Sequence, residues 1–545
     1  MTIGEKIKHL RKAYNISQSN LAKNLNVSRQ TISKWEGEES IPQLDKLREI
    51  ANIFKISYDE LINDEIVIHK GKTIPKCQNN EIKTKYFGTD GFRGEVNFTL
   101  TSDKAYKIGR FLGWYYSTPQ FNYHKPGYRP QIVIGKDTRR SSYMLEYAIS
   151  TGIAASGGDV SLMHVTTTPS VSYIVKEDHF DCGVMITASH NPFYDNGIKI
   201  LNSQGEKLED EVLVLIEAYL DNDLKKLNIK EDDLPLAVKE NIGVIKDYSS
   251  GRNRYIAYLI SLARHSFKKL RIGLDTANGA SYMIAKSVFN SLGANVYMIN
   301  DDPDGINVNV NAGSTHIDSL IKFVKENKLD IGFAFDGDAD RCIAVDENGK
   351  EVDGDKMLYL LANRLKATNS LYNDTVVTTI MSNSGLTKAL KQKGLKNVQT
   401  KVGDRFVYLE MLKNDYALGG EKSGHIIIRK YATTGDGILT AIMVVEEMLD
   451  THLKLSELVE DVKLLPQVLK NVRVTNKTAV MEDDTVKHKF EQINKEIGNN
   501  GRISLRESGT EPVIRIMVEA SSVKQCEKYI EKMYETIKER GFICE

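Results

Sequence analysis

The sequence has few cysteines, no long apolar run and no excess of charge of either sign. Its five cysteines are scattered, odd in number and without a CxxC pair, so neither a disulfide framework nor a zinc site is expected. No run approaches the roughly 18 apolar residues that a membrane-spanning helix needs, and the first residues are charged rather than signal-like. We therefore expect a cytoplasmic protein that does not bind a membrane.

The charge balance and the length limit the possible functions further. Lys plus Arg number 73, as do Asp plus Glu, so the chain has no global field that would hold it on nucleic acid or an anionic membrane. Any binding to nucleic acid or to a membrane must therefore come from a local group of charged residues. The 545 residues exceed what one hydrophobic core supports, since cores stop growing beyond roughly 250–300 residues, and several domains are expected.

The N-terminal segment, residues 1–66, has apolar residues at helical spacing and predicts a small all-α domain. Ser17 and Ser28 suit the N-caps of its second and third helices. Residues 67–84 are polar, lack a helical period and contain Pro75, which predicts a linker. The five expected helices span residues 3–13, 17–25, 28–36, 42–54 and 58–62.

From residue 85 onwards, strand-like runs alternate with helical stretches. This alternation predicts βαβ units with largely parallel sheets in more than one domain. The last eighty or so residues differ, with two strand-like runs and one long helix, and predict a smaller α+β domain. The expected domains span residues 85–245, 246–348, 349–463 and 464–545.

The aspartate loop, residues 336–341, places Asp336, Asp338 and Asp340 after the apolar run IGFAF, which predicts a buried strand. In an extended loop, a spacing of two places alternate side chains on one side. Three converging carboxylates repel one another unless a hard cation lies between them, and oxygen ligands suit Mg²⁺. A solvated acidic turn is the alternative. An EF-hand is disfavoured because Arg341 occupies its glycine position.

The serine loop, residues 187–192, follows the apolar run VMI and contains Ser189, His190 and Asn191. A serine at the end of a strand would lie at the carboxyl edge of an open α/β sheet, where such sheets bind ligands. A capped turn explains the pattern equally well. A Ser-His-Asp hydrolase is disfavoured because no GxSxG elbow surrounds Ser189.

Two further loops combine polar residues with glycine. The arginine loop, residues 506–512, together with Arg515, offers guanidinium and hydroxyl groups and a glycine beside which backbone N–H groups can approach an anion. It predicts a phosphate-binding site, although an ordinary surface turn is an equal alternative. The histidine loop, residues 420–425, offers donors and acceptors suited to sugar hydroxyls and is a weak signal by itself.

In order and content, these motifs resemble the α-D-phosphohexomutase family. The stretches that carry the resemblance are KYFGTDGFRG, ITASHNPFYDNGIKI, DGDADR, GEKSGH and RESGTEPVIRIMVE, and it extends over about residues 85–545. It implies three related α/β domains and a C-terminal α+β domain around a central cleft. The stretches FGTDGFRGEVN and KVGDRFVYLE are most similar to the branch that acts on glucosamine phosphate. Members acting on mannose or glucose phosphates, the alternative, often have His where this chain has Asp404.

The resemblance implies a mutase reaction on a hexosamine phosphate, through a hexose 1,6-bisphosphate. Ser189 would carry a phosphoryl group, and Mg²⁺ would be held by Asp336, Asp338, Asp340 and the phosphate on Ser189. Which of His190, Lys199 or His425 moves the hydroxyl proton stays open. The transfer site would also contain Arg93 and Arg341. The residues implied to hold the substrate are Glu421, Ser423, Arg506, Ser508, Gly509, Thr510 and Arg515.

Residues 17–54 resemble the Cro/repressor-type helix-turn-helix, with residues 28–36 as the recognition helix. Residues 1–34 carry seven basic residues against one acid, and residues 35–66 carry three against nine, so a basic half would face DNA. The alternatives are a role in protein contacts, and a transcription regulator that uses the mutase body as a sugar-phosphate sensor. A homodimer is expected, because such domains commonly bind two half-sites. The residues expected to contact DNA are Gln18, Ser28, Arg29, Gln30, Thr31, Ser33 and Lys34.

Overall fold

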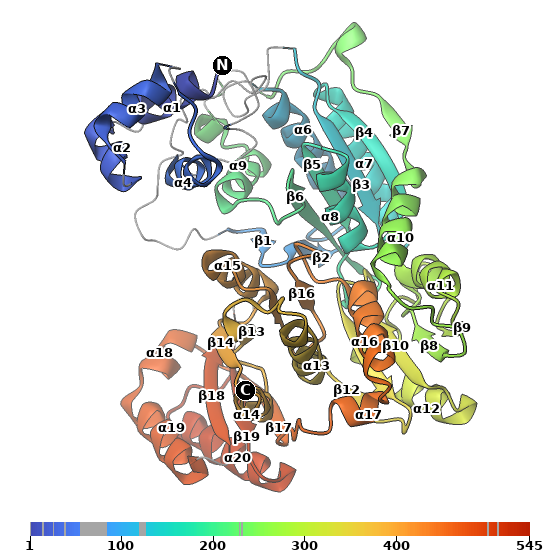
Figure 1. Cartoon of the computed structure of the whole chain (residues 1–545). Coiled ribbons are helices and arrows are strands. Elements are labelled where there is room, and N and C mark those ends of the chain that lie inside the picture. Colours follow the sequence, from blue (N-terminus) through green and yellow to red (C-terminus); the bar gives the residue numbers. More distant parts are fainter. Residues whose placement is uncertain are drawn as a thin grey trace.

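The N-terminal domain is a group of short helices around one apolar core (Figure 1). Ser17 and Ser28 cap α2 and α3, as expected, by accepting the Asn20 and Thr31 amides. Most of the fifth expected helix, 58–62, lies outside the described residues. The helices are α1 (Ile3–Ala13), α2 (Gln18–Asn24), α3 (Arg29–Glu36) and α4 (Leu44–Phe54).

The computed structural model describes residues 2–13, 16–25, 27–37, 40–54, 61, 84–118, 127–227, 229, 233–498, 501–508 and 512–544.

The first α/β unit is a seven-stranded sheet in the order β1-β2-β6-β5-β3-β4-β7. Its central strands β4, β3 and β5 are parallel, and every residue of β5 is buried. Its strands are β1 (Phe87–Gly88), β2 (Gly91–Glu95), β3 (Gln131–Lys136), β4 (Asp159–Val165), β5 (Cys182–Ile186), β6 (Asp195–Asn202) and β7 (Ile245–Asp247). Its helices are α6 (Ser102–Ser117), α7 (Ser142–Ala155), α8 (Thr168–Glu177) and α9 (Asp210–Leu220).

The second α/β unit has five strands in the order β12-β11-β10-β8-β9. Strand β10 pairs with β8 in parallel and with β11 antiparallel, and all residues of β10 and β11 are buried. Its strands are β8 (Arg271–Asp275), β9 (Asn295–Ile299), β10 (Ile331–Phe335), β11 (Cys342–Asp346) and β12 (Glu351–Val352). Its helices are α10 (Ser249–Leu262), α11 (Ser281–Ser291) and α12 (Asp318–Asn327).

The third α/β unit has four strands in the order β14-β13-β15-β16 and shares one large apolar core with the second. Its strands are β13 (Thr375–Thr379), β14 (Lys396–Thr400), β15 (Leu418–Gly420) and β16 (Ile426–Ile428). Its helices are α13 (Gly354–Ala367), α14 (Ser384–Gln392), α15 (Asp404–Asn414), α16 (Gly437–Thr451) and α17 (Leu455–Leu458).

The C-terminal unit is α+β, with an antiparallel sheet in the order β17-β19-β18 packed against helices α19 and α20 (Figure 1). Its elements are β17 (Gln467–Arg473), α18 (Lys477–Glu482), α19 (Asp484–Ile497), β18 (Arg502–Glu507), β19 (Val513–Glu519) and α20 (Val523–Glu539). Three α/β units, a C-terminal α+β unit and an N-terminal helical domain make up the expected fold class. Among the described residues, no helix is both long and apolar enough to cross a bilayer.

Candidate active site

The serine loop and the aspartate loop meet where two buried strands end. Ser189 follows β5 and Asp336 follows β10, so both lie at carboxyl edges of sheets. The Ser189 Oγ donates a hydrogen bond of 2.5 Å to Oδ2 of Asp336. Asp336, Asp338 and Asp340 are all buried, and one carboxylate oxygen from each lies within 4.8 Å of the others. The structure thus brings together four residues that the sequence predicts at one site.

A single buried ammonium partly neutralises this acidic cluster. Lys199, on β6, places its Nζ 2.8 Å from Asp338 and 3.0 Å from Asp340, and 3.2 Å from Asp90. Burial opposes the charge on Lys199, but the three carboxylates raise its pKa well above the ordinary value. Burial and the carboxylates of Asp340 and Asp338 raise the pKa of Asp336 to about 8. Lys199 therefore neutralises only part of the negative charge of the aspartate loop.

The oxygen atoms of the cluster fit a hard divalent cation. Oδ1 of Asp338 is buried without a hydrogen-bond partner, and Oδ1 of Asp340, also without one, faces His425 Nδ1 at 3.7 Å. A buried carboxylate oxygen left unpaired is costly, and oxygen ligands from carboxylates are those that Mg²⁺, Mn²⁺ and Ca²⁺ take. The geometry therefore supports a metal site formed by the three aspartates.

The groups predicted to act in phosphoryl transfer surround Ser189. His190 Nδ1 lies 3.5 Å from the Ser189 Oγ and 3.0 Å from Nη1 of Arg341. Burial, and then the positive charges of Arg341 and Arg93, lower the pKa of His190 to about 4, so the ring is neutral near pH 7. Arg93 forms an ion pair with Asp90 and lies 3.4 Å from the Asn191 side-chain oxygen. Arg341 and Arg93 thus contact the two residues that follow Ser189 in the serine loop.

The histidine loop contacts the metal site from the third unit. His425 Nδ1 lies 3.7 Å from Asp340 and its Nε2 lies 3.5 Å from Asp404. Burial opposes a charge on the ring, but the two carboxylates raise the pKa of His425 to about 9. The Gly435 N–H, however, donates to Nε2 at 3.0 Å, which requires that nitrogen to be unprotonated. This direct bond places the ring proton on Nδ1, facing Asp340.

The other two predicted residues of the histidine loop differ in their surroundings. Glu421 accepts the Gly403 N–H at 3.1 Å through Oε1, which ties the loop to the start of α15. Ser423 is exposed. The neighbouring Lys422 donates to Gln467 on β17 at 2.7 Å, so the C-terminal unit lies directly beside this loop.

The arginine loop presents two guanidinium groups from adjacent strands. Arg506 on β18 and Arg515 on β19 are opposite each other in the antiparallel register, and Arg515 Nη2 donates to Ser508 Oγ at 3.4 Å. Burial and then the charge of Arg515 lower the pKa of Arg506, while Glu421 opposes this shift. Two like charges held side by side favour an anion between them. The predicted residues Gly509 and Thr510 lie outside the described residues.

The predicted DNA-contacting residues are separate from this site. Ser28, Arg29, Gln30, Ser33 and Lys34 are exposed at the start and along the outer side of α3, and Thr31 is half-buried. Gln18 instead donates its amide to Glu36 at 2.9 Å. That side chain is engaged within the domain, and the Ser28 and Thr31 hydroxyls lie 2.8 Å apart and bond to each other. Arg29, Gln30, Ser33 and Lys34 are exposed at the surface.

Several residues at the site have only weak signals in the sequence or none. Lys207 bridges Asp90 at 3.1 Å and Asp404 at 2.7 Å, and all three border a cavity of about 280 Å³ between the first and third units. Asp90 and Asp404 stand in stretches that carry the family resemblance. Lys207, Arg139 and Asn309 belong to none of the predicted loops, because their contacts join residues far apart in the chain.

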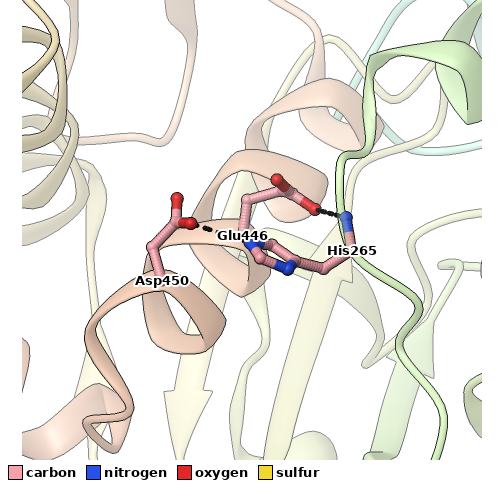
Figure 2. A group of neighbouring side chains, drawn as sticks. All are labelled: His265, Glu446 and Asp450. Carbon is pink, nitrogen blue, oxygen red and sulfur yellow. Dashed lines mark hydrogen bonds and ion pairs between the residues drawn. The ribbon is translucent and has the colours of Figure 1, made fainter.

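A second cluster of candidate ligands, His265, Glu446 and Asp450, lies away from the site (Figure 2). Glu446 accepts the backbone N–H groups of Arg264 and His265, both at 3.0 Å. Asp450 accepts from His265 Nε2 at 2.7 Å and from Arg364 at 2.6 Å. Because these donors already occupy the carboxylates, we interpret the cluster as an ion-pair network that joins the loop after α10 to helix α16.

Comparison with known families accounts for most of the chain. Residues 84–226, 253–349 and 353–465 match the alpha/beta/alpha domains I, II and III of phosphoglucomutase/phosphomannomutase, and residues 469–536 match its C-terminal domain. Residues 7–61 match a helix-turn-helix family.

Curated relatives are similar over nearly their whole length. A phosphoglucosamine mutase of Lachnospira eligens is 54% identical over 84% of this chain and 99% of the relative. That of Bacillus subtilis is 44% identical over 83% of this chain and 98% of the relative.

Solved structures share the fold. A phosphoglucomutase/phosphomannomutase family protein of Burkholderia thailandensis aligns with a TM-score of 0.68 at 22% identity, over 83% of this chain and 97% of that chain. An Aspergillus fumigatus N-acetylphosphoglucosamine mutase, solved with GlcNAc-6P and magnesium, aligns with a TM-score of 0.59 at 16% identity, over 84% and 96%.

Proposed function

The chain belongs to the phosphoglucomutase/phosphomannomutase family, with an added helix-turn-helix domain, and on this premise we propose that it is a phosphoglucosamine mutase. It would interconvert glucosamine 6-phosphate and glucosamine 1-phosphate through a phosphoserine at Ser189 and a 1,6-bisphosphate. The observation that carries the proposal is the buried Ser189 Oγ, 2.5 Å from Asp336 in a cluster of three aspartates. The preference for glucosamine rests on relatives that are 44–54% identical.

The residues around Ser189 suit the transfer of a phosphoryl group. The Arg341 guanidinium donates to the neutral His190 ring, and Arg93, Arg341 and Lys199 place positive charge where the transferring oxygens would lie. Asp336, Asp338 and Asp340 would hold Mg²⁺. When bound, the ion supplies charge neutralisation for the phosphoryl oxygens.

The substrate needs two kinds of contact in this cleft. Glu421 and Ser423 would hold sugar hydroxyls, while Arg506, Ser508, Gly509, Thr510 and Arg515 would anchor the phosphate that is not reacting. Because the sugar must be accepted in two orientations, one fixed phosphate anchor lets either phosphate face Ser189. We place this reaction in the cytoplasm.

The first test is turnover by the purified full-length protein with Mg²⁺ and a trace of glucose 1,6-bisphosphate. Glucosamine 6-phosphate, glucose 6-phosphate and mannose 6-phosphate are compared, with Ser189→Ala as the control. Rapid conversion of the amino sugar that is lost in Ser189→Ala supports the proposal. Faster conversion of the glucose or mannose phosphate would indicate a phosphomannomutase or phosphoglucomutase instead.

The helix-turn-helix domain supports a second function in addition to catalysis: we propose that the domain binds duplex DNA through α3. The exposed Arg29 and Lys34 on α3 carry this part of the proposal. If no sugar phosphate turns over, the chain would be a transcription regulator with the mutase body as its sensor. The domain would act in a homodimer, with one copy for each half-site.

DNA binding can be measured by fluorescence anisotropy with a labelled duplex at several salt concentrations. Arg29→Ala and Lys34→Ala should each reduce the slope of log K against log salt by about 1, since each removes one phosphate contact. Lys430→Ala, which removes an exposed charge from the mutase body, should leave the slope unchanged. Equal slopes in all variants would contradict DNA binding by α3.

A further inference from the structure

The nucleophile Ser189 has an unusual backbone conformation. Its φ is 51°, in the left-handed region that residues other than glycine seldom adopt. Such a conformation persists only where the surrounding structure over-determines it. Since Ser189 is fully buried, the contacts that hold it must come from neighbouring protein groups.

Three hydrogen bonds fix the Ser189 backbone. Its N–H donates to Thr187 Oγ1 at 2.9 Å, and its carbonyl oxygen accepts from Arg139 Nη2 and from Asn309 Nδ2, each at 2.9 Å. The same two side chains donate to the carbonyl of Asn191, at 2.8 Å and 3.3 Å. Arg139 and Asn309 together therefore hold both ends of the turn that presents Ser189.

The two donors come from different units of the protein. Arg139 follows β3 in the first unit, and its Nε also donates to Asp137 at 2.8 Å. Asn309 lies in the second unit, between β9 and α12, and a Cβ on Gly337 of the aspartate loop would lie 3.1 Å from its Nδ2. The loops are in close contact, because a Cβ on Gly337 would lie only 2.5 Å from the Ser189 carbonyl oxygen.

We propose that Asn309 is a positioning residue for phosphoryl transfer, a role that rests on the proposed function of Ser189. Its amide holds the Ser189 carbonyl, so that the Oγ stays beside Asp336. It also ties the serine loop of the first unit to the second unit, which carries the aspartates. Asn309 is the better of the two donors to test, since removing the buried Arg139 would leave Asp137 without its charge partner.

The same loop provides a matched control. Asn309 and Asn311 are both left-handed, with φ values of 60° and 49°, so an alanine at either position meets a similar backbone cost. Asn309 is buried against the serine loop, whereas Asn311 is exposed. The variants Asn309→Ala and Asn311→Ala therefore differ mainly in the contact to Ser189.

The experiment measures the rate at which glucose 1,6-bisphosphate phosphorylates Ser189, by intact-protein mass in single turnover, together with kcat, KM and Tm. Asn309→Ala should slow phosphorylation and kcat about tenfold, the effect expected from loss of the hydrogen bond to the Ser189 carbonyl, with KM little changed. Asn311→Ala should keep the wild-type rate, and its Tm should fall only by the backbone cost that the two alanine variants share. Asn309→Asp, which keeps the volume but cannot donate, should be at least as slow as the alanine variant.

A wild-type phosphorylation rate in Asn309→Ala or Asn309→Asp would overturn the role of Asn309 while leaving the mutase function standing. Absence of phosphoserine in the wild-type protein would overturn both.

Discussion

The Ser189 Oγ lies 2.5 Å from the Oδ2 of Asp336, although 147 positions separate the two residues in the chain. This hydrogen bond joins the hydroxyl at the end of β5 to the carboxylate at the end of β10. The proposed phosphoryl carrier and the proposed metal ligands are therefore adjacent before any ligand binds.

Asp336→Asn should separate metal binding from folding. The substitution removes one of three converging carboxylates, whose burial and mutual repulsion raise the pKa of Asp336 to about 8. Without divalent cations, the Tm of the variant should equal or exceed that of the wild type. Addition of Mg²⁺ should raise the wild-type Tm but not that of the variant, and turnover should fall at least about 100-fold. Thermal denaturation with EDTA or MgCl₂ tests this, and an unchanged Mg²⁺-induced shift would contradict it.

Lys199→Met should destabilise the metal-free protein. The variant keeps an unbranched side chain but leaves Asp338, Asp340 and Asp90 without their shared ammonium. Removing one partner of a buried ion pair costs about 3–5 kcal/mol. Because a bound cation would replace the lost charge, Mg²⁺ should stabilise this variant more than the wild type. Lys207→Met is the control; its side chain is 24% exposed, and the loss measured by urea unfolding should be smaller.

Arg515→Ala should weaken binding of sugar phosphates. Arg506 and Arg515 are opposite each other on β18 and β19, where an anion would relieve their repulsion. Loss of a charge-assisted hydrogen bond should raise KM about 10–100-fold, with a smaller effect on kcat because the anchored phosphate does not react. Lys470→Ala, which removes a half-exposed cation on β17, should keep the wild-type KM. Steady-state kinetics measures KM for the sugar phosphate in each variant. An unchanged KM in Arg515→Ala would exclude Arg515 as a phosphate anchor.

The N-terminal domain should lose stability in acid through Glu36. Burial opposes ionisation of this carboxyl, but the hydrogen bonds from Arg11 and Gln18 hold its pKa below the ordinary value of 4.5. Its ionised form therefore stabilises the domain above about pH 4.5, and this contribution disappears as the pH falls through the folded-state pKa. Glu36→Gln should lower the stability near pH 7 by about 3 kcal/mol and should flatten this pH dependence.

Trp35 reports on this domain, since the only other tryptophan, Trp114, lies in the first α/β unit. Fluorescence of the full chain carrying Trp114→Phe therefore follows the N-terminal domain during unfolding. Glu49→Gln, at a more exposed pair with Lys46, should change little. A Glu36→Gln variant that keeps the wild-type acid dependence would contradict the assignment.

Patterns confined to short stretches of sequence predicted the local structure correctly at the helix caps and at the aspartate loop. The caps Ser17 and Ser28 lie where the sequence predicts helix starts, because a cap acts over only three residues. The aspartate loop follows a buried strand as its apolar run predicts. Gln18 shows the limit of such patterns, since a polar residue at a helix start can as well serve its own domain, and here it contacts Glu36.

The sequence by itself determined the kinds of elements, the fold class and the loops that carry the chemistry, because periodicity and motif spacing are local properties. Only the tertiary structure decided that Arg139 and Asn309 hold the Ser189 carbonyl, that Lys199 neutralises Asp338 and Asp340, and that Lys207 bridges Asp90 and Asp404. These contacts join residues separated by 50 to 197 positions. Their partners are selected by how the units pack, which no local pattern records.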